Sequence, residues 1–165
     1  MPWPQRCKLI SDAQKSHGSN VIICAMPTTL LSSRSFPAYY RNLAPLADYV
    51  LKFAREFGFN PKDLYAVELA LDEACSNVID HGYKGEGKGS IDIELSNEEC
   101  EFIIKVEDTG KAFDPDCIPS PDLTSPLDLR CERGLGVFTM RKLMDRVEFS
   151  RSKGKNCLFL VKRLP

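Results

Sequence analysis

The stretch ELALDEACSNVIDHGY, from Glu68 to Tyr83, carries two kinds of side chain at helical spacing. Glu73 and Asn77 lie four positions apart, which places both on one face of a helix. A helix that needs only one apolar face therefore aligns a carboxylate with a carboxamide, and this pairing suggests a functional site. The apolar residues of the other face recur every three or four positions: Leu64, Val67, Leu71, Ala74, Cys75 and Val78.

Length and charge limit where the function can reside. The chain has 165 residues, with 22 Lys and Arg against 23 Asp and Glu. That length suits one domain with a substantial core, and the balanced charge provides no global attraction for nucleic acid or an anionic membrane. The longest apolar run, residues 21–26, is far shorter than the ~20 residues that a spanning helix needs. We therefore expect a cytoplasmic protein that binds neither nucleic acid nor membrane directly.

The cysteines do not indicate a metal site. Seven cysteines are an odd number, and the chain has no CxxC pair with a histidine nearby, which argues against a zinc site and a complete set of disulfides. Cys75, Cys100 and Cys157 lie within apolar patterns, so we expect them to be small buried core residues.

Periodicity predicts an N-terminal extension at residues 1–26 and a single domain at residues 27–165. Strands and helices without β-α-β alternation favour an α+β two-layer sandwich, in which helices cover one face of a mainly antiparallel sheet. A proline-rich stretch of about twenty residues after Gly110 is long enough to suggest a functional lid. Strands are predicted at 29–36, 90–95, 102–107, 146–151 and 156–163, and helices at 42–57, from Asn60-Pro61 to the glycine-rich turn at 82–89, and at 134–144.

The Glu73 and Asn77 pair has a chemical interpretation and a structural one. A carboxylate can act as a general base, and a neutral carboxamide oxygen can ligate Mg²⁺ without repelling the phosphates that share the ion. A solvated polar helix face would produce the same spacing, so the pair alone leaves both interpretations open.

Two glycine-containing motifs extend the candidate site. Asp108-Thr109-Gly110 ends the apolar strand FIIKVE, where a carboxylate could accept the amino group of adenine and a glycine lets a flat ligand approach the backbone. A simple turn explains this motif equally well.

The second motif, Gly134-Leu135-Gly136, lies between the predicted lid and a helix, where free backbone N–H groups can bind phosphate. Arg133 stands beside it and could neutralise a terminal phosphate. A flexible entry into the helix is the alternative interpretation.

The order of these motifs along the chain carries more information than any one of them. A helix with E-x-x-x-N, a strand ending in DTG, a long lid, an RGLG helix and a final hairpin together resemble the GHKL nucleotide-binding domains, the Bergerat fold of gyrase, Hsp90, MutL and histidine kinases. Within that superfamily, FPAYYRNLAPLADYV, ELALDEACSNVIDHGY, RGLGVFTMRKLMD and NCLFLVKRL look like the RsbW-type anti-sigma-factor serine/threonine kinases. The resemblance covers about Thr29 to Leu164.

This resemblance implies roles for the matching residues. Glu73 would accept a proton from a protein serine or threonine, and Asn77 would hold Mg²⁺. Asp108 would bind the amino group of adenine, with Gly110 beneath the ring. The phosphates of ATP would lie against Arg133, Gly134, Leu135 and Gly136.

The resemblance also implies a function and partners. We expect an ATP- and Mg²⁺-dependent kinase that phosphorylates a STAS-domain anti-sigma-factor antagonist, alternately sequesters a sigma factor, and forms a homodimer. The alternative is a nucleotide-gated protein-binding module without significant kinase activity. One departure bears on this choice, because many family members carry a threonine after the glycine of the last hairpin, whereas this chain has Gly154-Lys155-Asn156.

Overall fold

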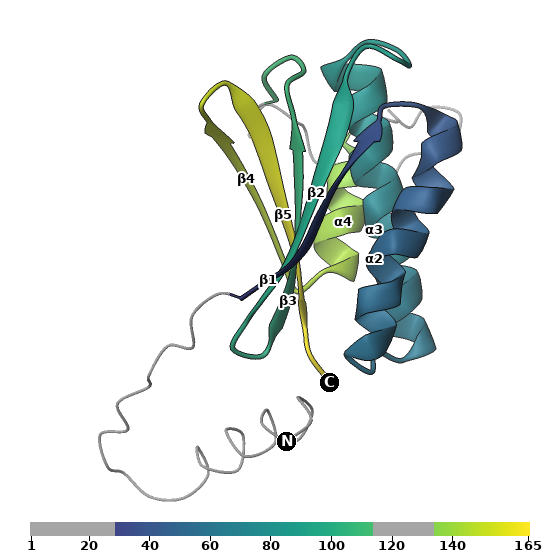
Figure 1. Ribbon diagram of the computed structural model, residues 1–165, viewed down its shortest axis with the longest axis vertical. Helices are drawn as coiled ribbons and strands as arrows, with labels where there is room; N and C mark the ends of the chain where they lie inside the picture. Colours follow the sequence, from purple (N-terminus) through teal and green to yellow (C-terminus); the bar gives the residue numbers. More distant parts are fainter. Residues whose placement is uncertain (1–28, 114–133) are drawn as a thin grey trace, which may run out of the picture.

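The computed structural model describes residues 29–113 and 134–165, which form two layers (Figure 1). Within these residues, five strands form one sheet in the order β1-β2-β3-β5-β4, and every neighbouring pair is antiparallel. The predicted extension, Arg133 and the predicted lid from residue 114 onward lie outside the described residues. The strands are β1 (Thr29–Pro37), β2 (Ser90–Glu98), β3 (Glu101–Asp108), β4 (Arg146–Ser152) and β5 (Lys155–Arg163).

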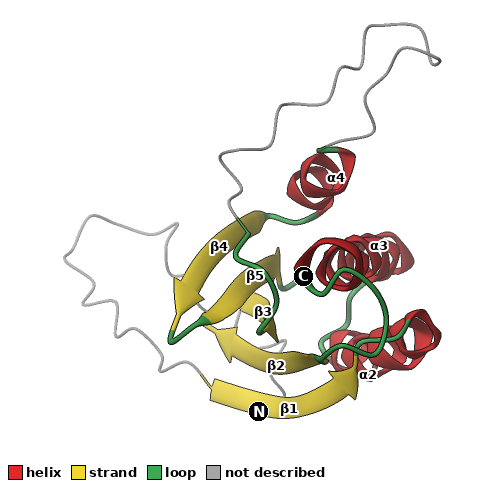
Figure 2. Cartoon of the chain, turned by 90° about the horizontal axis from the view of Figure 1, so that it is seen from above, coloured by secondary structure: helices red, strands yellow, loops and turns green. Residues whose placement is uncertain are grey.

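The second layer consists of helices that pack on the same face of the sheet (Figure 2). The layers enclose a core to which both contribute, for example Leu46 and Leu71 from helices and Ile104 and Leu160 from strands. The predicted α+β sandwich is therefore confirmed, with β1 as an edge strand. None of the described helices has the length and apolar character needed to cross a membrane. The helices are α2 (Leu43–Glu56), α3 (Pro61–Asn77) and α4 (Leu135–Leu143), with a 3-10 turn at Tyr40–Asn42 and a π turn at Val78–Gly82.

Helix α3 begins where the sequence predicts. Asn60 Oδ1 accepts a hydrogen bond from Asp63 N at 3.0 Å, and Pro61 occupies the first turn. The carboxylate of Asp63 accepts a hydrogen bond in return, at 2.7 Å from Asn60 Nδ2. In a capping box this donor would be the backbone N–H of the cap residue, whereas here it is the side-chain amide. At the other end α3 widens into the π turn, which closes with Tyr83 N donating to Val78 O at 2.8 Å. Such turns are frequent at functional sites.

The hairpin of β2 and β3 is longer than predicted. Six polar residues, 96–101, were predicted to form its turn, but the strands continue to Glu98 and restart at Glu101. Glu99 adopts a φ of +50°, which allows the chain to reverse within two residues. Ser96 and Asn97 are buried within β2 although they are polar. The polar character of Ser96 and Asn97 therefore wrongly indicated a turn, whereas both residues belong to the strand.

The cysteine predictions hold for two of the three positions. Cys75 and Cys157 are buried, whereas Cys100 is only partly buried because it lies in the β2–β3 turn. The prediction for Cys100 was therefore wrong.

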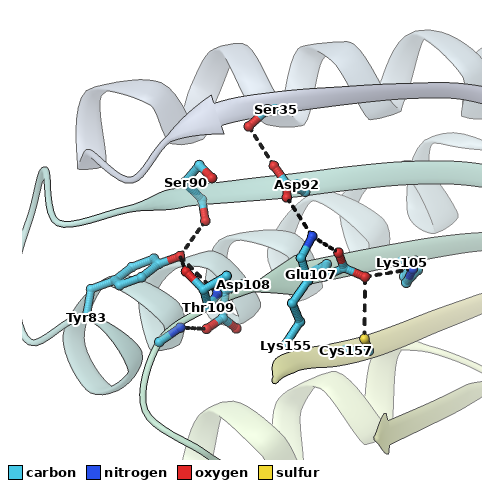
Figure 3. Close-up of polar contacts among 11 residues, drawn as sticks. Ser35, Tyr83, Ser90, Asp92, Lys105, Glu107, Asp108, Thr109, Lys155 and Cys157 are labelled. Carbon is cyan, nitrogen blue, oxygen red and sulfur yellow. Dashed lines mark hydrogen bonds and ion pairs between the residues drawn. The ribbon is translucent and has the colours of Figure 1, made fainter. Parts of the chain in front are cut away.

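A charged network crosses the sheet face that the described helices leave uncovered (Figure 3). Glu107 of β3 is bonded to Lys105 Nζ at 2.8 Å and to Lys155 Nζ of β5. Lys155 Nζ also lies 3.6 Å from Asp92 Oδ2, and Asp92 Oδ1 accepts the hydroxyl of Ser35 at 2.6 Å. Hydrogen bonds from Lys105 and Lys155 lower the pKa of Glu107 to about 2. The network therefore ties four strands together through one strongly acidic carboxylate.

This lowered pKa predicts that the stability of the fold depends on acid. Because the pKa of Glu107 falls from 4.5 to about 2 on folding, its contribution is complete above 4.5 and is lost as the pH falls from 4.5 toward 2. Glu107→Gln should lower the free energy of unfolding by about 1 kcal/mol at pH 7, a value kept small because exposed lysines are screened by water. The difference from wild type should vanish near pH 2.

Urea unfolding at pH 7 and at low pH measures this difference. Glu56→Gln, at an exposed position of α2, is the matched control and should change stability little at either pH. A loss for Glu107→Gln that is the same at both pH values would contradict the prediction.

Candidate functional site

A pocket of about 310 Å³ opens beside the C-terminal end of α3, where β3 and β5 meet the helix layer. Its described lining combines mostly apolar side chains with several polar groups, as is typical of small-molecule sites. Asn77 and Asp108, two of the predicted site residues, both line it. The apolar part comes from Ala74, Val78, Val106, Met140, Phe149 and Leu158.

Asp108 places a buried carboxylate in this pocket. Its side chain ends β3 and is 7% exposed. Oδ1 accepts hydrogen bonds from Gly110 N at 2.7 Å and from Asn156 Nδ2 at 2.9 Å. No donor from the described residues reaches Oδ2. Because a buried carboxylate needs partners, the arrangement fixes the orientation of Asp108 and leaves it able to accept a donor from a ligand.

Two glycines, Gly110 and the pocket residue Gly82, come very close to each other. A Cβ at Gly110 would lie 2.7 Å from the carbonyl carbon of Gly82 and 2.8 Å from its Cα. Lys111 N donates to Gly82 O at 2.9 Å, so the segment after β3 is bonded directly to the π turn. Only glycine fits at position 110 without displacing this backbone. The approach of a flat ligand to Gly110 stays a prediction.

Tyr83 connects the Asp108-Thr109-Gly110 motif to the start of β2 (Figure 3). Its hydroxyl donates to Ser90 O at 2.7 Å and accepts a hydrogen bond from Thr109 N at 3.1 Å. The first residue of β2 and the middle of the DTG motif are thereby held by one side chain. Tyr83 was not singled out from the sequence as a site residue.

The entry of α4 packs against the polar pair of α3. Gly134 has a φ of +86°, a left-handed conformation that favours glycine, and Leu135 begins the helix with its side chain 48% exposed. A Cβ at Gly136 would lie 2.6 Å from Glu73 Oε2 and 3.2 Å from Asn77 Nδ2. The structure therefore brings the predicted glycine motif, the carboxylate and the carboxamide together.

Glu73 is a partly buried carboxylate with altered acidity. Burial is the main reason that its pKa is raised, and the negative charge of Asp72 adds to the effect. A raised pKa moves a carboxylate toward the range in which a general base works best near neutral pH.

Asp80 and His81, one turn beyond Asn77, have different environments. His81 lines the pocket, whereas Asp80 accepts a hydrogen bond from the hydroxyl of Tyr40 at the start of the helix layer. Asp80 thus binds a side chain from a distant part of the sequence.

Asn156 is the main site residue whose role the sequence did not predict. Besides its bond to Asp108, its Nδ2 lies 3.0 Å from Lys111 O and 3.4 Å from Gly110 O. The sequence carries no local signal for this role, because it is the antiparallel pairing of β3 with β5 that sets Asp108 opposite Asn156. The segment Gly154-Lys155-Asn156, where this chain differs from many family members, therefore lies at the site. There the amide of Asn156 donates to the carboxylate of Asp108.

An aromatic pair forms the other side of the pocket. The rings of Phe113 and Phe149 have centroids 5.1 Å apart and planes inclined by 35°. Neither residue stood out in the sequence, because Phe149 belongs to an ordinary strand pattern and Phe113 lies at the start of the predicted lid.

Comparison with known families agrees with this arrangement. The profile described as "Histidine kinase-like ATPase domain" matches residues 36–162. The chain belongs to the histidine kinase-like ATPase domain family. The match lies within the predicted domain at 27–165, and the RsbW-type resemblance seen in the sequence is confirmed by the relatives described next.

Individual relatives of this ATPase domain carry the name serine-protein kinase RsbW. The protein from Halalkalibacterium halodurans is 33% identical over 105 residues, which cover 61% of this chain and 64% of that one. The protein from Bacillus cereus strain AH820 is 32% identical over 109 residues, covering 64% and 68% respectively. The chain thus spans just under two thirds of the length of the first of these relatives.

A solved structure supports the fold of this family member. The crystal structure of the RsbU and RsbW domains of a Mycobacterium tuberculosis protein superposes with a TM-score of 0.56 and 16% sequence identity. The superposition covers 84% of this chain and 33% of that one. At this identity the likeness concerns the fold alone.

Gly110 and Gly82 should respond differently to the same substitution. Gly110→Ala would place a methyl group against the backbone of Gly82, so we expect a loss of about 1–3 kcal/mol in the free energy of unfolding. Gly82→Ala is the matched control, because its Cβ would meet Asp108 Oδ1 at 3.5 Å, an ordinary contact, and its backbone is helical. Chemical denaturation measures both variants. Equal stability of the two would contradict the packing described here.

Proposed function

We infer that this chain is a protein serine/threonine kinase that uses ATP and Mg²⁺ to phosphorylate a STAS-domain anti-sigma-factor antagonist, and that it binds a sigma factor as an alternate partner. The observation that carries the proposal is the packing of Gly136 against Glu73 and Asn77 beside a pocket that ends in Asp108. RsbW-named relatives support this choice of reaction. A homodimer and a cytoplasmic location are parts of the same proposal.

The pocket has the chemistry that adenine requires. A flat apolar base fits between side chains such as Val78 and Met140, and its exocyclic amine is a donor for the carboxylate of Asp108. A position of Gly110 beneath the ring is part of this proposal. Burial of Asp108 strengthens such a hydrogen bond, because water competes poorly for it.

The neighbouring residues suit the phosphates and the metal. Asn77 offers a neutral oxygen of the kind that Mg²⁺ accepts, and when bound the ion would neutralise charge on the phosphates. Gly134, Leu135 and Gly136 open α4, where backbone N–H groups face outward at the positive end of the helix. Arg133, which precedes them in the sequence, is proposed as a further phosphate ligand.

Glu73 would act as the base for the transfer. As the hydroxyl oxygen of a protein serine or threonine bonds to the γ-phosphorus, the bond to the β–γ bridging oxygen breaks and ADP leaves. The proton of the hydroxyl passes to the carboxylate of Glu73. The raised pKa of Glu73 favours this role, because a base with a higher pKa holds the proton more strongly.

Phosphorylation would then alter partner choice. A phosphate adds about two negative charges at neutral pH and can expel the modified antagonist from an acidic surface. Release of the antagonist would free the kinase to bind its sigma factor.

Binding of nucleotide is the first consequence to test. Isothermal titration with ATP should give Mg²⁺-dependent binding, and Asn77→Ala should reduce the affinity about tenfold or more in the presence of Mg²⁺ while changing it little in EDTA. Ser76→Ala, at the preceding position of α3, is the control and should bind like wild type. The same affinity for wild type and Asn77→Ala with Mg²⁺ would show that Asn77 is not a metal ligand.

Transfer is tested with STAS-domain proteins from the same genome, each purified and incubated with labelled ATP. Glu73→Gln should retain ATP binding and lose about 100-fold or more of the transfer rate, since removal of a general base costs 10²–10⁴. The wild-type rate should also fall as the pH drops through the raised pKa of Glu73. Glu56→Gln is the control. Tight ATP binding with no transfer to any STAS protein would favour the nucleotide-gated binding module instead.

A further inference from the structure

A second hollow lies on the helix layer, away from the nucleotide pocket. It has a volume of about 420 Å³ and runs between α2 and α3. Tyr40 and Tyr65 line it and are 45% and 63% exposed, although large hydrophobic side chains are usually covered. Leu43 and Leu69 add apolar surface from the two helices. We call this hollow the α2–α3 groove.

The charge of the α2–α3 groove has one sign. Glu68 and Asp72 line it, and no lysine or arginine from the described residues does. An occupant that combines apolar side chains with lysine or arginine would complement both the aromatic surface and the two carboxylates.

The position of the groove relates it to the proposed base. Asp72 lines the groove and precedes Glu73, and it lies close enough to contribute to the raised pKa of Glu73. Exposed Leu135 begins α4, one residue before the Gly136 that packs against Glu73. Glu73 thus follows a residue of the groove and packs against the neighbour of an exposed apolar side chain, so a protein seated in the groove could bring a hydroxyl to the carboxylate.

The rim of the groove is also connected to the nucleotide pocket. The hydroxyl of Tyr40 donates to Asp80, three residues after Asn77, and Tyr40 N donates to Glu86 Oε1 at 2.7 Å. Both acceptors belong to the segment that includes Gly82, which forms part of the pocket. A partner that contacts Tyr40 would thus touch a residue bonded to the segment that carries Gly82.

We propose that the α2–α3 groove is the docking surface for the phosphoacceptor protein, which inserts a segment carrying apolar side chains flanked by lysine or arginine. This proposal rests on the proposed kinase function and adds to it the surface that selects the substrate. The segment would bury Tyr65 and pair with Glu68, and its neighbouring serine or threonine would approach Glu73 from the exposed side of α3.

The test uses Tyr65→Ala and Glu68→Lys with the STAS-domain protein that wild type phosphorylates most rapidly. Each variant should raise KM for that protein about tenfold or more, as loss of a central interface residue does, with kcat and the affinity for ATP within about twofold of wild type. Leu30→Ala and Glu56→Lys, at exposed positions outside the groove, are the matched controls. Glu68 is preferred to Asp72 because Asp72 acts on the pKa of Glu73.

A charge swap makes the test specific. If a lysine or arginine of the STAS protein pairs with Glu68, its replacement by glutamate should weaken phosphorylation by wild type, and Glu68→Lys should restore it at least partly. Unchanged KM values for Tyr65→Ala and Glu68→Lys, with transfer intact, would overturn the docking surface and leave the kinase standing.

Failure of the kinase is distinguishable from failure of the groove. If no STAS protein is phosphorylated, calorimetry with the same proteins decides the matter. Binding that Tyr65→Ala weakens would keep the groove and overturn the kinase. Binding that survives both variants, or no binding to any STAS protein, would overturn the groove.

Discussion

The site depends on the close approach of two backbones at Gly82 and Gly110. A Cβ at position 110 would lie 2.7 Å from the carbonyl carbon of Gly82, and Lys111 N is bonded to Gly82 O at 2.9 Å. This contact fixes the end of β3 to the end of α3, although the two are joined by about thirty residues of chain. Asn77 at the end of α3 and Asp108 at the end of β3 both line the pocket beside this contact.

Helix α3 can serve both the core and the site because small buried residues line one face and the polar pair Glu73 and Asn77 lies on another. Small buried residues, Ala66, Ala70 and Ala74, recur every four positions and let neighbouring elements come close. Glu73 and Asn77 lie beside them, where Gly136 of α4 offers no side chain. The absence of a Cβ at Gly136 thus permits the carboxylate and carboxamide to remain at a helix–helix contact. A larger residue there would displace the two groups that the proposed transfer requires.

Much of the fold was predictable because its signals are local. Asn60 and Pro61 start a helix by their own backbone chemistry. The contact of Gly110 with the backbone of Gly82 is not local and was not predicted. The end of the β2–β3 hairpin was not predictable, since its reversal relies on Glu99 in a left-handed conformation rather than on a glycine or asparagine. The partners of Asp108 and Asp80 required tertiary knowledge: Asn156 reaches Asp108 through strand register, and Tyr40 reaches Asp80 across forty residues of sequence.

The acidity of Glu73 connects the nucleotide pocket with the α2–α3 groove. Burial is the larger cause of its raised pKa and belongs to the packing of α3 against α4, so it persists whatever the partner. The negative charge of Asp72 is the smaller cause, and Asp72 faces the groove. A basic side chain docked there would offset that charge and lower the pKa of Glu73. Under the proposed docking, the charge that selects the substrate would therefore also act on the proposed base.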